Sequence, residues 1–126
     1  MVLMLICITT SCLQEPNYEE NLGPRYDIET VDVDYYNYYI SPRNKLDFET
    51  YEVETMMLAR HKVNQYSVFI IHCKSHSAAE ELASDILRNQ KSNSEYDNPS
   101  EDFDLIVDGS VILFGDEKAI EDAQGE

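Results

Sequence analysis

The chain has 126 residues and a formal net charge of −16, with 25 acidic residues against 9 lysines and arginines. This length suits one folded domain rather than two. The charge argues against nucleic acid as a partner and against attachment to anionic lipid through a basic patch, because both need clustered lysine and arginine.

The first twelve residues have the layout of a bacterial lipoprotein signal. Residues 1–8 are almost wholly apolar and lead through small residues to Cys12. The apolar run is too short to cross a bilayer, which takes about 20 residues. We therefore expect residues 1–11 to be a signal segment and Cys12 to carry a lipid, although no basic residue precedes Arg25. The alternative is that this segment is the first buried strand of a cytosolic domain.

The rest of the N-terminal half divides into a tether and the start of a domain. Residues 12–30 hold two prolines, a glycine and several acids without an apolar period, which indicates an acidic tether. A single α+β domain is expected over residues 31–126. Its first strand is predicted at 31–40, where valine and tyrosine alternate with Asp32 and Asp34. The polar segment 42–50 predicts a loop.

The middle of the chain holds the clearest strand and helix. Residues 51–63 fit either a strand or a short helix, whereas the continuous apolar run in 66–73 is typical of a central strand. Ser77 and Glu80 have the spacing of a capping box, and apolar residues recur behind them at helical spacing. A helix is therefore predicted over about 78–90.

The C-terminal part predicts a loop at 92–102, a hairpin at 103–115 and a helix at 116–123. Asp108-Gly109 lies between the two apolar runs of the hairpin, and Asp116 is the expected N-cap of the helix. This order of elements predicts an α+β fold with a small, mainly antiparallel sheet and helices packed on one face.

Several of these segments also follow the order of a known family. They are Thr10-Ser11-Cys12, the tyrosine-rich stretch from Tyr26-Asp27-Ile28 to Tyr39-Ile40-Ser41, the strand Val68-Phe69-Ile70-Ile71 with its helix, and the hairpin before Asp116-Glu117-Lys118-Ala119. Over about residues 26–122 the chain resembles small lipoproteins of Gram-positive bacteria, mostly Clostridia, catalogued as a domain of unknown function. The resemblance implies a lipid anchor and brings no catalytic residue.

The tyrosine cluster is the best candidate for a binding surface, because tyrosine is enriched at interfaces. In an extended segment, Tyr36 and Tyr38 would lie on the face opposite Val33 and would be exposed. Asp32 and Asp34 would share one strand face, where they could bind a cation, act as acid and base, or simply be solvated. These four residues are the predicted ligand-binding candidates.

Catalytic and metal-binding interpretations are weaker. His72, Cys73 and His76 are metal-ligand types, but neighbours on a strand point to opposite faces, and structural zinc needs four ligands. Cys73 could serve as a nucleophile with a histidine base, but it follows a buried strand rather than an electropositive setting. The acids in 95–104 lack the spacing of a calcium loop. We expect no metal and no cofactor.

The sequence thus predicts a non-enzymatic binding or accessory module. A lipid on Cys12 would hold it at the outer side of the cell membrane, and its partner would be a protein or polymer of the envelope. One alternative is a cytosolic acidic regulator or inhibitor. The other is a small enzyme that depends on Cys73 or on a metal.

Overall fold

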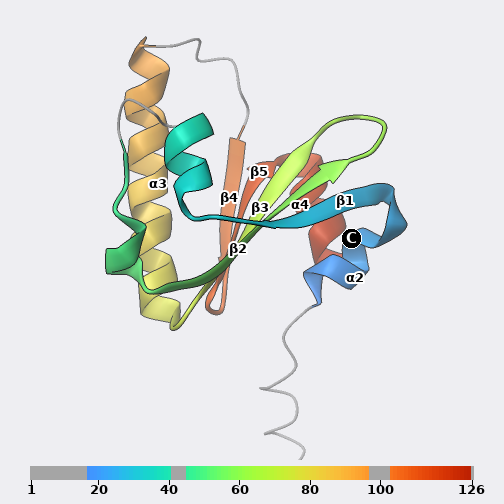
Figure 1. Cartoon of the computed structure of the whole chain (residues 1–126), viewed down its shortest axis with the longest axis horizontal. Helices are drawn as coiled ribbons and strands as arrows, with labels where there is room; N and C mark the ends of the chain where they lie inside the picture. Colours follow the sequence, from blue (N-terminus) through green and yellow to red (C-terminus); the bar gives the residue numbers. More distant parts are fainter. Residues whose placement is uncertain (1–16, 41–44, 97–102, 126) are drawn as a thin grey trace, which may run out of the picture.

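The computed structural model describes residues 17–40, 45–96 and 103–125, which form one antiparallel sheet with helices around it (Figure 1). The strand order is β1-β2-β3-β5-β4. The strands are β1 (Tyr26–Val31), β2 (Val53–His61), β3 (Ser67–Cys73), β4 (Phe103–Asp108) and β5 (Val111–Asp116). The helices are α2 (Tyr18–Leu22), α3 (His76–Tyr96) and α4 (Glu117–Gln124), with the shorter turns η1 (Gly23–Arg25), η2 (Tyr36–Ile40) and η3 (Phe48–Tyr51).

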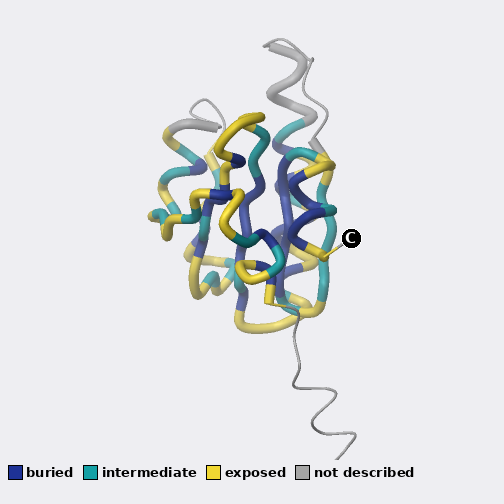
Figure 2. Tube along the Cα trace, turned by 90° about the vertical axis from the view of Figure 1, so that its right-hand side faces the viewer, coloured by how far each residue is buried: buried dark blue, intermediate teal, exposed yellow. Residues whose placement is uncertain are grey.

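The sheet has helices on both faces. The prediction of an α+β fold with an antiparallel sheet is confirmed, but its helices do not all pack on one face as expected. On β3, Phe69 and Ile71 belong to the core under α3, whereas Val68 and Ile70 belong to the core under α2 and α4. A strand that is apolar at consecutive positions needs cover on both sides. In Figure 2 the buried stretches accordingly run through the middle of the molecule.

The strands at 53–61 and 67–73 confirm the strand interpretation of 51–63 and the predicted strand at 66–73. The predicted hairpin also forms, but Asp108 pairs with Val111, so its two turn residues are Gly109 and Ser110. Gly109 has a φ of 63°, and Ser110 has no positive φ. A glycine at the first position alone fits a type II′ turn, whose twist matches that of the flanking strands.

Both predicted helices form, with different capping. Helix α3 begins at His76, and the hydroxyl of Ser75 accepts the N–H of Ala78 at 3.1 Å, so Ser75 rather than Ser77 caps it. Asp116 does occupy the N-cap position of α4. However, its carboxylate makes no bond to that helix and instead accepts the N–H of Ser67 at 2.7 Å. Asp116 therefore ties β5 to the start of β3.

Residues 17–30 do not form part of a tether, contrary to the prediction for 12–30. They form α2, η1 and β1, and the side chains of Tyr18, Leu22 and Tyr26 are buried. The side chain of Asn21 donates to the carbonyl of Ala123 at 2.8 Å, which joins α2 to α4. The domain therefore starts before residue 31, while residues 1–16, including Cys12, lie outside the described part of the chain.

A buried carboxylate strengthens this junction. Asp122, with 3% of its surface exposed, accepts the hydroxyl of Tyr26 at 2.7 Å and the ammonium of Lys118 at 3.0 Å. Arg25 lies 3.9 Å away. Burial by itself raises the pKa of Asp122, but the two hydrogen bonds and the positive charges outweigh it and hold this pKa below its usual value.

Candidate functional site

The segment after β1 turns sharply instead of continuing as a strand. The carboxylate of Asp32 accepts the N–H of Asp34 at 3.0 Å, and the carbonyl of Asp32 accepts the N–H of Tyr35 at 2.8 Å. The first bond forms an Asx turn, which aspartate favours because its side chain can replace a backbone acceptor, and the second closes a backbone turn of four residues. The strand predicted at 31–40 therefore ends at Val31, and a helical turn follows.

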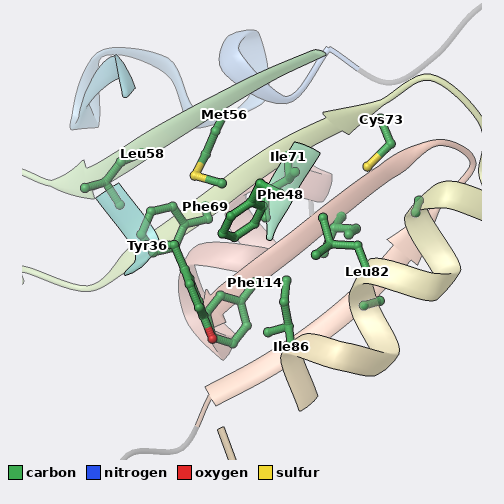
Figure 3. Packing of buried hydrophobic residues seen from close by; sticks show 13 residues of the cluster. Tyr36, Phe48, Met56, Leu58, Phe69, Ile71, Cys73, Leu82, Ile86 and Phe114 are labelled. Atoms are coloured by element: carbon green, nitrogen blue, oxygen red, sulfur yellow. The ribbon is translucent and has the colours of Figure 1, made fainter. Parts of the chain in front are cut away.

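Tyr36 is an anchor in the core and not an exposed binding residue. Its side chain is 0% exposed, and its ring lies 5.5 Å from that of Phe48 and 6.2 Å from that of Phe114 (Figure 3). The hydroxyl donates to Asn89 Oδ1 at 2.7 Å and accepts from Gln90 Nε2 at 2.8 Å. Burial raises its pKa to about 12. The prediction that Tyr36 is exposed was wrong because it assumed strand alternation where the chain is helical.

The other three predicted binding residues lie together. Asp32, Asp34 and Tyr38 line a shallow hollow of about 340 Å³, and Tyr35 also lines it. Tyr38 is 72% exposed and both carboxylates are exposed. The ring of Tyr35 is half-buried and meets that of Phe69 edge-on at 5.9 Å between centroids. Tyr35 was missed as a binding residue because the sequence analysis assumed strand alternation. The spacing of residues 35 and 38 in a helix places both on one side.

These groups suit a positively charged ligand. Two carboxylates offer charge-assisted hydrogen bonds to an ammonium or guanidinium group. Tyrosine rings attract the same cations through their electron-rich faces. The hollow in the 32–38 segment is open rather than enclosed, which favours binding of a protruding side chain over enclosure of a whole small molecule.

Two further hollows border β1. One, of about 330 Å³, is lined by Asp27, Ile28, Glu29, Leu58 and Arg60. The other, of about 470 Å³, is lined by Glu19, Thr30, Glu54, Thr55, Met57 and His72. The first hollow includes Leu58 from the face under α3, whereas the second includes Met57 from the other face and reaches His72 on the central strand β3.

The thiol of Cys73 does not suit nucleophilic catalysis. It is buried in the core under α3, and burial, with the nearby charge of Glu54, raises its pKa to about 11. A nucleophilic cysteine requires the opposite shift. His72 lines a hollow beside Met57 on the other face, which confirms that neighbours 72 and 73 point apart. In the described segments, no group of three or more His, Cys, Asp or Glu residues is arranged to hold a metal ion.

Comparison with protein-family models, with curated proteins and with solved structures found no match to this chain. The resemblance to clostridial lipoproteins therefore stays a prediction. Among the helices that the structure describes, none is both long and apolar enough to span a membrane.

Proposed function

We propose that this protein is a non-enzymatic binding module of the bacterial envelope, anchored by a lipid on Cys12. It recognises a positively charged group of an envelope protein or polymer in the hollow lined by Asp32, Asp34, Tyr35 and Tyr38. That hollow carries the proposal, because it gathers two carboxylates and two aromatic rings on an exposed turn.

The hollow is supported by a preformed frame. The buried ring of Tyr36 fixes the turn from below. The side-chain amide of Asn37 donates to the carbonyl of Leu46 at 2.7 Å and accepts its N–H at 2.8 Å. A surface held in its binding geometry loses less conformational entropy when a ligand binds, which raises affinity.

The charge of the whole chain supports the same ligand class. A net charge of −16 attracts cations over long range and speeds their encounter with the surface. Exposed ion pairs contribute little each, about 0–1 kcal/mol. A single cation should therefore bind weakly, and tight binding requires a partner that makes contacts beyond the hollow.

The hollow can be tested by NMR titration of the ¹⁵N-labelled full chain with N-acetyl-lysine amide. We expect shifts in residues 32–38 and none with the neutral norleucine analogue. Asp34→Asn should weaken binding because it removes one carboxylate charge. Asp104→Asn, which removes an exposed acid on β4, should leave binding unchanged. Equal binding of the neutral analogue would refute recognition of charge.

The anchor is tested separately, by intact mass and membrane fractionation in a Gram-positive host. We expect the protein to begin at Cys12, to carry acyl mass and to be found with the membrane. Cys12→Ala should release it, whereas Cys7→Ala, in the segment removed by processing, should not. Retention of an unmodified Met1 in the cytosol would instead support the acidic regulator.

A further inference from the structure

Strand β1 is an edge strand of the sheet that the described residues form. It pairs with β2 and with no other described strand. The N–H of Lys62 donates to the carbonyl of Arg25 at 3.0 Å across this pair. Because bonding direction alternates along a strand, the backbone groups of Ile28 and Thr30 face away from β2. Neither has a hydrogen-bond partner on that side within the described residues.

The side chains along β1 determine what could pair with this edge. Asp27 and Glu29 are exposed on the face that also carries Leu58 and Arg60, whereas Ile28 packs against the core under α2 and α4. In an added strand, every second side chain would lie beside Asp27 and Glu29. The residues between them would lie beside Ile28 on the other face. An alternation of basic and apolar residues matches this edge.

The negative charge is least balanced toward the end of β1. Lys62 Nζ lies 3.9 Å from Asp27 Oδ1, and Arg60 pairs opposite Asp27 in the sheet. Glu29 has Leu58 opposite it instead. Directly beyond β1 comes the 32–38 hollow with its two further carboxylates. An added strand could therefore place one basic side chain beside Glu29 and another in the hollow.

Charge also excludes the two other candidates for this edge. A second copy pairing through its own β1 would bring Asp27 and Glu29 against acidic residues, and each chain has a net charge of −16. Like charges on neighbouring strands are destabilising, and charged edges are a common protection against self-association. Residues 1–16 of the same chain contain no lysine or arginine. Charge complementarity leaves a basic partner.

We propose that the partner is an extended basic peptide segment that adds a strand to the sheet along β1 and places a basic side chain in the 32–38 hollow. The peptide backbone would bond to the outward N–H and C=O groups of Ile28 and Thr30. In this mode of recognition the backbone bonds provide affinity and the alternate side chains provide specificity. This inference rests on the proposed function and names the partner's chemistry.

The test uses the full ¹⁵N-labelled chain and the peptide acetyl-Lys-Val-Lys-Val-Lys-Val-amide. In one analogue the backbone nitrogen of every lysine is methylated, and in the other that of every valine. Only one of these two sets of backbone N–H groups faces β1 in an added strand. We expect the parent peptide to slow hydrogen exchange at Ile28 and Thr30. One analogue should bind about tenfold more weakly, and the other should bind like the parent.

Variants of the protein provide a second measurement. Thr30→Pro removes an outward N–H at an edge position, where proline is compatible with a strand. It should weaken binding of the parent peptide about tenfold, whereas Thr30→Val, which keeps the N–H, should not. The N-methylated peptides decide the question even if the proline variant does not fold.

The outcomes separate this inference from the proposed function. If both N-methylated analogues bind like the parent and shifts are confined to 32–38, strand addition is refuted and recognition in the hollow stands. If Ile28 and Thr30 are protected without any effect at 32–38, the edge is confirmed and the hollow is refuted. Absence of binding by the hexapeptide overturns the inference, and the lysine amide titration then decides the hollow alone.

Discussion

Tyr36→Phe is the sharpest test of the structure, because it removes one oxygen atom from the middle of the core. The Tyr36 hydroxyl donates to Asn89 Oδ1 at 2.7 Å and accepts from Gln90 Nε2 at 2.8 Å. The ring stays in the variant, so packing against the surrounding phenylalanines is kept. Any loss of stability therefore reports on these two hydrogen bonds.

The expected cost follows from the burial of the two partners. Asn89 is buried, so its side-chain carbonyl loses a bond that water cannot easily replace. Gln90 is half-buried, and its amide can turn toward solvent. Depriving a buried polar group of a partner costs about 1–3 kcal/mol. We expect Tyr36→Phe to lower the free energy of unfolding by about 1.5 kcal/mol, mostly through Asn89.

Tyr38→Phe is the matched control, because it removes the same atom from a side chain that is 72% exposed. It should change stability by less than about 0.5 kcal/mol. Urea unfolding followed by far-ultraviolet circular dichroism measures both variants, since the chain has no tryptophan to report by fluorescence. If Tyr36→Phe proved as silent as Tyr38→Phe, the placement of Tyr36 in the core would be wrong. Binding of the lysine amide should survive Tyr36→Phe and weaken in Tyr38→Ala.

Three other predictions concern pH and backbone packing. The pKa of Asp122 in the folded protein lies below its ordinary value of 3.8. Its contribution to stability is therefore present above pH 3.8 and is lost as the pH falls through the folded pKa. Asp122→Asn should reduce the loss of stability that the protein shows at acid pH. The pKa of Tyr36 is raised from 10.0 to about 12. Its contribution to stability is therefore present below pH 10 and is lost as the pH rises toward 12. Tyr36→Phe should reduce the loss of stability that the protein shows at alkaline pH. Gly115→Ala would place a Cβ 2.3 Å from the carbonyl oxygen of Ser67 and should lower unfolding free energy by about 3 kcal/mol. Gly109→Ala meets nothing within 4 Å and should cost only about 1 kcal/mol for its positive φ. Equal unfolding midpoints for the two alanine variants would contradict the close approach of β5 to β3.

Local patterns predicted several elements correctly. The apolar run in 66–73, the helical spacing behind Ser77 and the glycine between two apolar runs correspond to β3, α3 and the β4–β5 hairpin. Each signal depends on residues that are neighbours in the chain. The segment 31–40 was predicted wrongly, because its alternation is interrupted where the carboxylate of Asp32 closes a turn.

The candidate site was predicted in part. Asp32, Asp34 and Tyr38 lie at the hollow because all three are on an exposed turn that polar residues favour. Residue type does not separate Tyr36 from Tyr38, and the strand spacing assumed for 31–40 placed both on one face. What separates them is contact with Phe48, Phe69 and Phe114, which come from three distant parts of the chain.

The sequence by itself determined the acidic character of the protein and most of its strands and helices, because charge and periodicity are properties of the chain alone. Only the tertiary structure decided that residues 18–30 belong to the domain, that helices cover both faces of the sheet and that β1, among the described strands, pairs on one side alone. Burial and pairing depend on segments that meet only when the chain folds. No pattern of neighbouring residues contains that information.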